Sequence, residues 1–278
     1  MPFAIPVHPG ESPDLPAIDT RADGGMKKTA GVAALAPLAR ELGDLQELLY
    51  AAGTHSLLLI LQGMDTSGKD GTVRSVLRYV NPTGCRVVGF KVPSVVERAH
   101  DFLWRVHRET PERGAMVVFN RSHYEDVLVT RVNGLIEEPT WRARYGHINA
   151  FERLLVDAGT IVVKIFLHIS EVEQEERLRA READPTKAWK LSAGDWVERR
   201  RWDDYQTAYG EALAACSMSH APWWIVPADR KWFRNLAVAE AVVSALRPHR
   251  PTWEAELDRR GASELAEISA LRDGTTGI

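Results

Sequence analysis

The stretch LLLILQGMDTSGKDG, residues 57–71, is the part of the sequence that most strongly indicates the fold. It opens with an apolar run of strand length and continues into a glycine-rich turn. Gly63, Gly68 and Lys69 have the G-x-x-x-x-G-K spacing, in which backbone N–H groups face a phosphate and the lysine adds a positive charge. Residues 72–79 then follow with helical periodicity. Strand, loop and helix together predict a phosphate-binding loop, and the alternative is a plain glycine-rich turn.

Two carboxylates distinguish this loop from the usual pattern. Asp70 follows the lysine where a Ser or Thr hydroxyl usually holds magnesium, and Asp65 lies inside the loop. Two acids beside a bound phosphate would repel it unless a divalent cation lay between them. Asp70 has the alternative role of a helix cap, which Asp65 lacks. The loop therefore predicts magnesium, with Asp65 as the stronger ligand candidate.

Composition limits the class of protein. The chain has 278 residues and is 45% hydrophobic, which suits one large α/β domain. A net charge of -3 argues against nucleic-acid binding through bulk charge, and the apolar runs are too short to span a membrane. Cys85 and Cys216 are far apart, as expected for reduced thiols in a cytoplasmic protein. Residues 1–30 are rich in proline near their start and predict a flexible tail, not a signal peptide.

The pattern of apolar residues predicts alternating strands and helices. Strands are expected at 57–61, 85–92, 116–119, 160–167 and 223–226, with helices at 32–52, 94–108, 141–158 and 232–246. This alternation predicts an α/β fold with a central parallel five-stranded sheet and helices on both faces. Because such sheets bind ligands at the carboxyl ends of their strands, the polar cluster 120–126 should face the phosphate loop.

The segment between the last two predicted strands is longer than one crossover needs. It is polar and lies at the ligand end, so it predicts a helical lid at about 171–203. The domain is expected to cover 31–250, followed by a C-terminal extension at 251–278 in which 254–272 forms one more helix.

Three segments together closely resemble the polyphosphate kinase 2 family. They are GMDTSGKDG at 63–71, FNRSHYEDV at 119–127, and WKLS at 189–192 with Asp195. The resemblance covers roughly Leu35 to Leu246. It implies a three-layer P-loop kinase fold similar to that of thymidylate kinase. It also implies reversible transfer of a phosphoryl group from inorganic polyphosphate to ADP and AMP, or to GDP and GMP, with Mg²⁺ or alternatively Mn²⁺. The oligomeric state stays open, with a dimer and a tetramer as the possibilities.

The resemblance also implies residue roles. Asp65 matches the aspartate that holds magnesium, Lys69 the lysine that contacts polyphosphate, and Arg121 the arginine that stabilises phosphate charge at the reacting centre. Asn120 departs from the family, because many members have aspartate there, but an amide oxygen still ligates magnesium. Glu125 and Asp126 resemble the group that phosphorylates both AMP and ADP, and an acid at 125 would recruit an additional magnesium.

Further candidates surround these positions. The phosphate-binding candidates are Gly63, Thr66, Ser67, Gly68, Asp70, Gly71, Arg74, Arg78, Lys91, Arg177 and Arg181. The nucleotide-binding candidates are Glu125, Asp126, Arg131, Lys187, Trp189, Lys190 and Asp195. The alternative for each of the basic residues is a solvated helix face. His123 is predicted to be structural, since a phosphate acceptor needs no general base.

Two other functions fit part of the sequence. An ATP-dependent nucleoside monophosphate kinase of the thymidylate type would have the same fold, but the second and third segments argue against it. A polyphosphate-sensing binding protein would not need Asp65, Lys69 and Arg121 together.

Overall fold

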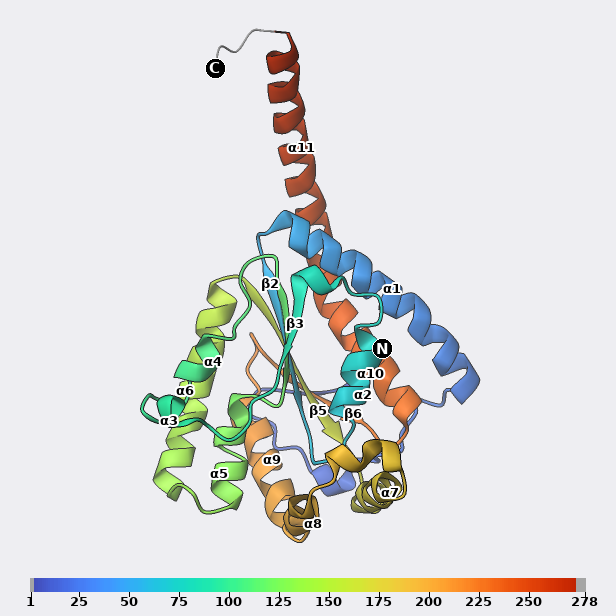
Figure 1. Cartoon of the computed structure of the whole chain (residues 1–278), viewed down its shortest axis with the longest axis vertical. Coiled ribbons are helices and arrows are strands. Elements are labelled where there is room, and N and C mark those ends of the chain that lie inside the picture. The colour runs from blue at the N-terminus through green and yellow to red at the C-terminus, as the bar shows by residue number, and fades with distance from the viewer. Residues whose placement is uncertain (1–2, 274–278) are drawn as a thin grey trace.

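A computed structural model describes residues 3–273 and contains a six-stranded sheet (Figure 1). The strands are β1 (Ile5–Val7), β2 (Ser56–Gln62), β3 (Cys85–Val88), β4 (Met116–Asn120), β5 (Thr160–His168) and β6 (Trp223–Pro227). Their order across the sheet is β1-β6-β5-β2-β4-β3. β1 pairs antiparallel with β6, and the other pairs are parallel. The predicted parallel strands are present, but the predicted total of five is wrong because β1 adds a sixth.

Helices cover both faces of this sheet (Figure 1). One face carries α1 (Lys28–Ala52), α2 (Lys69–Val76) and α10 (Lys231–Leu246), and the other carries α6 (Glu138–Asp157) and α9 (Trp202–Cys216). The remaining α-helices are α3 (Val95–Arg98), α4 (Trp104–His107), α5 (Val129–Val132), α7 (Glu171–Glu182), α8 (Ala193–Arg199) and α11 (Arg250–Arg272), and a short 3-10 helix (His123–Asp126) follows β4. The mixed α/β architecture expected from the sequence is therefore observed.

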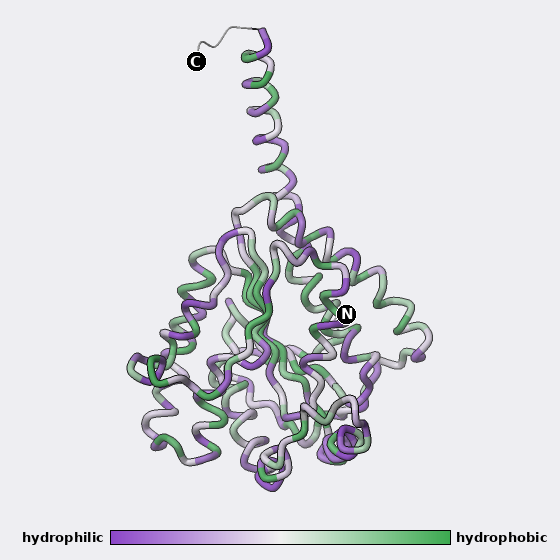
Figure 2. Tube along the Cα trace, in the orientation of Figure 1, coloured by the Kyte–Doolittle hydropathy of each residue, from purple (hydrophilic) through white to green (hydrophobic). Residues whose placement is uncertain are grey.

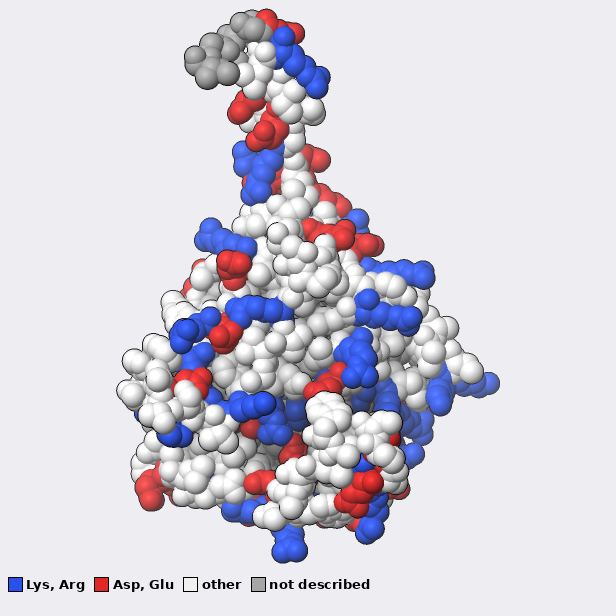
Figure 3. All heavy atoms as spheres, viewed as in Figure 1, with Lys and Arg blue, Asp and Glu red and all other residues white. Residues whose placement is uncertain are grey.

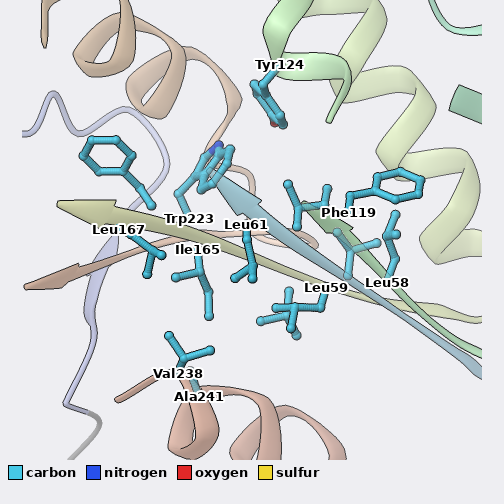
Figure 4. Close-up of a cluster of buried hydrophobic side chains, with 14 of the residues drawn as sticks. Leu58, Leu59, Leu61, Phe119, Tyr124, Ile165, Leu167, Trp223, Val238 and Ala241 are labelled. Carbon is cyan, nitrogen blue, oxygen red and sulfur yellow. The ribbon is translucent and has the colours of Figure 1, made fainter. Parts of the chain in front are cut away.

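The core lies between the sheet and these helices. Every residue of β2 is buried, because β2 has a parallel neighbour on each side and a helical layer over each face. The apolar strands run through the middle of the molecule, whereas the outer helices are more hydrophilic (Figure 2). Val238 and Ala241 of α10 approach the sheet from one side and Tyr124 from the other (Figure 4). This packing holds the carboxyl ends of β2 and β4 rigidly side by side.

The N-terminal segment differs from the flexible tail that the sequence predicted. Ile5 pairs with Ile225, the carbonyl of Leu15 accepts a hydrogen bond from His168 Nε2 at 2.9 Å, and Thr20 Oγ1 donates to Asp229 at 2.8 Å. The prolines that suggested disorder are compatible with an edge strand, where a missing N–H donor is tolerated. The described part of this segment is thus packed along the β6 edge of the sheet.

Two further boundaries were predicted incorrectly. The single helix expected at 94–108 is interrupted, because the Asp101 carboxylate accepts a hydrogen bond from the backbone N–H of Leu103 and forms a turn between α3 and α4. The strand expected to reach residue 92 ends at Val88, so that Gly89, Phe90 and Lys91 are free to face the ligand end of the sheet.

The C-terminal extension forms α11, as the sequence predicted for 254–272. Its base is fixed by the buried Trp253, and its outer part projects away from the body (Figure 1). Among the residues that the structure describes, no helix is long and apolar enough to cross a membrane.

Candidate active site

The phosphate loop connects β2 to α2 and depends on its glycines. Gly68 lies immediately before α2 with a φ of 101°, and Gly63 follows β2 with a φ of 151°. L-residues rarely adopt these backbone conformations. A side-chain carbon at Gly63 would lie 2.6 Å from the carbonyl oxygen of Leu167, and one at Gly68 would overlap the guanidinium of Arg234. Gly63 therefore requires glycine for two independent reasons, whereas at Gly68 the backbone conformation is the firm reason, because the end of a long side chain such as Arg234 can shift.

Lys69 is buried at the start of α2 and lies across the loop. Its ammonium donates hydrogen bonds to the carbonyls of Gly63 at 2.7 Å and Met64 at 3.2 Å. Burial, together with the neighbouring positive charge of Arg121, lowers the pKa of Lys69 to about 8. The lysine is thus held in a place where its charge is unfavourable until an anion approaches.

Arg121 follows β4 and reaches toward the loop from the neighbouring strand. Its φ of 67° is unusual for a residue with a side chain, and Thr66 in the phosphate loop has a similar φ of 62°. Arg121 forms ion pairs with Asp65 and with Glu125, the latter at 3.2 Å. Burial alone would lower its pKa, but the two carboxylates outweigh burial and raise it. The guanidinium therefore stays charged and links the two predicted site segments.

Oxygen ligands for a divalent cation converge at the same place. Asn120 Nδ2 donates to Asp70 Oδ1 at 2.7 Å, so the Asn120 carbonyl oxygen stays available for a metal, and Asp65 lies in the same cavity. Magnesium prefers such hard oxygen ligands and keeps several positions for phosphates and water. In the described part of the chain, no group of three or more His, Cys, Asp or Glu side chains is arranged to hold a metal ion by itself. The residues fit a cation that is shared with bound phosphates.

A cavity of about 760 Å³ opens between the loop, α10 and the segment that carries α7 and α8. Its charged lining is strongly basic, with eight Lys and Arg side chains against three Asp. In Figure 3, Lys and Arg side chains gather around the middle of this face. The predicted candidates that line it are Asp65, Thr66, Gly68, Lys69, Asp70, Gly71, Arg74, Lys91, Asn120, Arg121, Arg177, Arg181, Trp189 and Asp195. This geometry suits an extended polyanion.

A smaller cavity of about 140 Å³ lies on the other side of Asp65 and Arg121. It is lined by Glu125, Tyr205 and Tyr209, with the predicted Gly63 at one edge. The Asp65–Arg121 ion pair therefore borders both cavities, and the two cavities meet at the residues with the strongest predicted roles.

Arg177 lines the larger cavity, but its hydrogen bonds differ from the phosphate contact that the sequence suggested. A guanidinium has five N–H donors. In Arg177 they point to the carboxylate of Glu173, to the carbonyls of Thr66 and Ser67, and to the carbonyls of Ala228 and Asp229. All of the donors are used within the protein, so Arg177 connects α7 to the phosphate loop and to the turn after β6.

Four other described candidates do not border either cavity. Asp126 is buried against Arg105 at 3.2 Å and Arg144, and Arg131 donates to both carboxylate oxygens of Glu211. Arg78 instead lies over the ring of Tyr79. Their contacts support the scaffold, and the geometry argues against direct roles in nucleotide or phosphate binding. Ser67 is buried within the loop.

Residues of α7, α8 and the segment between them line one side of the larger cavity and are partly exposed. Arg181 and Asp195 form an ion pair at 2.6 Å between α7 and α8, and the Trp189 side chain is 79% exposed. Burial, followed by the negative charge of Asp65, raises the pKa of Asp195. The side chains of Lys187 and Lys190 lie outside the described residues.

Two basic residues of the cavity were missed. Lys231 and Arg234 come from the first turns of α10, and Arg234 Nη1 donates to the carbonyl of Ser67 at 3.2 Å. Burial and the nearby Arg177 lower the pKa of Arg234 to about 10. A signal was present in the sequence: these residues directly follow the last parallel strand, at the sheet edge where ligands bind. Gly89, Phe90 and Ala180 also line the cavity without having been predicted.

A glycine-rich loop between a strand and a helix, a buried lysine, carboxylates in and after the loop, and an arginine that follows the neighbouring strand define a P-loop phosphotransferase. Comparison with known proteins makes this specific. Residues 25–253 match the model of the family described as Polyphosphate kinase 2. The chain belongs to the polyphosphate kinase 2 family and is a polyphosphate kinase.

Individual relatives agree with this assignment. The chain is 52% identical over 222 residues to an AMP/ADP-polyphosphate phosphotransferase of Meiothermus ruber, covering 80% of this chain and 82% of that protein. It is 47% identical over 211 residues to an ADP-polyphosphate phosphotransferase of Rhodopseudomonas palustris, covering 72% and 73%. The crystal structure of Polyphosphate Kinase 2 from Arthrobacter aurescens TC1 superimposes with a TM-score of 0.84 at 43% identity, covering 87% and 88% of the two chains.

Proposed function

We propose that this enzyme transfers a phosphoryl group from inorganic polyphosphate to both AMP and ADP, with Mg²⁺ as its cofactor. The observation that most supports this proposal is that Asp65 and Arg121 border both cavities. A phosphoryl donor in one cavity and an acceptor nucleotide in the other would therefore meet at this ion pair. The larger, basic cavity suits the polyphosphate chain, and the smaller one suits the acceptor phosphate beside Glu125. The relative from Meiothermus ruber, whose name includes AMP and ADP, supports this acceptor range.

The protein's part in the reaction is positioning and charge neutralisation. Lys69 and Arg121 bind and orient the transferred group, and an acceptor phosphate oxygen is itself the nucleophile, so no general base is required. Asp65 and Asn120 would hold Mg²⁺, which neutralises part of the phosphate charge when bound. In that role Asp65 would give up its ion pair with Arg121.

We also propose that residues 171–203 act as a lid. They include α7 and α8, and Arg181 and Trp189 face the cavity from this segment. Closure would cover the phosphates and exclude water, which would otherwise compete with the nucleotide as acceptor. The anchoring of Arg177 to the phosphate loop makes the base of α7 the fixed end of the lid.

The acceptor range can be tested at Glu125. Purified enzyme, polyphosphate and magnesium are incubated separately with AMP, ADP, GMP and GDP, and products are followed by chromatography. We expect Glu125→Asn to lower the rate with AMP by about tenfold relative to the rate with ADP, because the charge at this position is proposed to serve the shorter phosphate chain. Glu109→Gln, a surface carboxylate paired with Arg86, is the matched control. Equal changes with both nucleotides would contradict the proposal.

A further inference from the structure

A fully buried polar cluster lies beneath the Arg121 segment and is not used by the chemistry described above. It consists of Lys164 in β5, Glu152 in α6, and Tyr124 and His123 in the short helix after Arg121. All four side chains are almost completely inaccessible to solvent. Such a group in an otherwise apolar interior needs a physical explanation, because burying charges costs free energy.

The cluster is densely hydrogen-bonded, and His123 Nδ1 is its one buried polar atom without a partner among the described residues. The Lys164 ammonium donates to Glu152 Oε2 at 2.6 Å, to Tyr124 Oη at 3.1 Å and to the carbonyl of Cys216 at 2.6 Å. Glu152 Oε1 accepts from Tyr124 Oη at 2.9 Å and lies 3.2 Å from His123 Nε2. Burial alone would raise the pKa of Glu152, but Lys164 and His123 outweigh it and lower the pKa. No member can shift without losing a hydrogen bond in a dry environment.

Stability alone is a weak explanation for this network. A buried ion pair commonly contributes little, because desolvation offsets the attraction, and well-packed apolar residues of similar volume serve as well. The Glu152–Lys164 ion pair also fixes the orientation of the Tyr124 side chain, because Tyr124 Oη is hydrogen-bonded to both residues. The Tyr124 ring also packs edge-on against Trp223, with the ring centroids 4.8 Å apart (Figure 4).

Tyr124 is connected to Arg121 through only two residues of backbone. Ser122 Oγ accepts hydrogen bonds from the backbone N–H of Tyr124 at 3.2 Å and from Gln62 Nε2 at 3.1 Å, and the backbone N–H of Arg121 donates to the carbonyl of Leu61. The φ of 67° at Arg121 is strained and persists only where its surroundings enforce it. The buried cluster fixes one end of this segment, and β2 fixes the other.

We propose that Glu152 and Lys164 are positioning residues for Arg121: they hold Tyr124, and through it the strained backbone that directs the Arg121 guanidinium toward the reacting phosphates. The inference rests on the proposed role of Arg121 in phosphoryl transfer. Neither residue lies at the proposed substrate-binding cavities, and both would act by fixing the position of the Arg121 side chain.

Two variants test this without relying on one substitution. Glu152→Gln keeps the shape of the side chain but leaves Lys164 without its counter-charge, and Tyr124→Phe removes the hydroxyl while leaving the ion pair intact. We expect kcat to fall about tenfold or more in both, because a displacement near 1 Å of a catalytic group costs up to about a hundredfold. The KM for ADP should change less than about twofold. Glu152→Asp, which keeps the charge, should restore part of the loss.

A kinetic double-mutant cycle separates positioning from general destabilisation. Each variant is combined with Arg121→Ala, and initial rates are compared under conditions in which all proteins are folded by circular dichroism. If the cluster acts through Arg121, Glu152→Gln and Tyr124→Phe should lower kcat less than about twofold further once Arg121 is absent.

Thr160→Val provides the matched control. Thr160 is buried at the opposite end of β5 and accepts a hydrogen bond from Ser56 Oγ at 3.0 Å. Its effect on kcat should be the same with and without Arg121. Effects of Glu152→Gln and Tyr124→Phe that multiply fully with that of Arg121→Ala would overturn the positioning role. Arg121→Ala alone with near-normal turnover would instead refute the proposed function, so the two failures are distinguishable.

Discussion

Lys69 is proposed to act through its positive charge, and burial disfavours that charge where the residue lies. Because its pKa is lowered to about 8, an increasing fraction of the free enzyme loses the ammonium above that pH. We expect kcat/KM for polyphosphate to be nearly constant below about pH 7, to reach half of that value near pH 8 and to fall further above it, since kcat/KM reports ionisation in the free enzyme. Bound phosphate favours the charged form, so kcat should be less sensitive. Initial rates across pH at low polyphosphate concentration provide the measurement.

Lys69→Arg is the control for this pH dependence, because a guanidinium stays protonated throughout the range. Its activity should be lower at every pH but should lack the decrease above pH 8. The same decrease in Lys69→Arg would assign it to another group. The free energy of unfolding depends on pH in the opposite direction to the activity. Between pH 8 and 10.5 Lys69 binds fewer protons in the folded state than in the unfolded state, so its contribution to stability increases as pH rises.

The sequence predicted the cavity residues that belong to a recognisable motif, but it did not predict the positions of side chains that depend on packing. Asp65, Lys69, Asn120 and Arg121 lie together because a loop pattern and two strand ends place them there. By contrast, Asp126 lies in the same motif but is turned inward to Arg105, and Arg234 comes from a distant helix. The inward orientation of Asp126 does not follow from spacing along the chain, since it depends on which side chains the folded core brings into contact. For Arg234 a signal was present, because α10 begins soon after the last parallel strand.

Two of the arginines in α7, Arg177 and Arg179, have contrasting environments. Arg177 uses its donors to join α7 to the phosphate loop, whereas Arg179 is 68% exposed, pairs with Glu175 of its own helix and lies over the ring of Trp196. We expect Arg177→Gln to lower kcat by about tenfold or more and to reduce the melting temperature, because it leaves several buried carbonyls without donors. Steady-state kinetics and calorimetry report both effects.

Arg179→Gln is the matched substitution on the same helix, and it should change neither quantity measurably. The direct phosphate contact suggested by the sequence makes a different prediction for Arg177→Gln: a higher KM for polyphosphate with an unchanged melting temperature. That outcome would contradict the anchoring role derived from the hydrogen bonds.

The elements themselves were largely predictable, and the exceptions have local causes. The strands around the loop are long apolar runs with no competing structure, so their type and order follow from periodicity. β1 was missed because it is short and rich in proline, and it becomes a strand only by pairing with β6. Edge pairing of this kind is a tertiary effect that local sequence does not encode.

Across the whole molecule, the two ends of the chain differ in what they contribute. The N-terminal segment is joined to the sheet edge and to the turn after β6 through Leu15, Thr20 and Asp23. Beyond Gly261, α11 has no buried residue among those described. We expect deletion of residues 1–23 to lower the melting temperature by several degrees, and truncation after Gly261 to change it by less than about 2 °C. Thermal unfolding at equal protein concentration compares the two.

Trp253→Ala distinguishes the base of α11 from its outer part. Trp253 is fully buried and its indole N–H donates to His55 at 3.2 Å, so its loss should cost about 3–5 kcal/mol. A truncation after Gly261 that destabilises as strongly as Trp253→Ala would show that the outer part of α11 has contacts beyond this chain's own body.

We propose that the phosphate loop and Arg121 transfer a phosphoryl group directly from polyphosphate to a nucleotide. The most direct measurement incubates the purified enzyme with ADP, polyphosphate and Mg²⁺, with no other nucleotide present, and follows ATP by ³¹P NMR. We expect ATP to form at the expense of polyphosphate, and Lys69→Ala to be slower by about a hundredfold or more. ATP formation only when a nucleoside triphosphate is supplied as donor, or at an undiminished rate in Lys69→Ala, would contradict it.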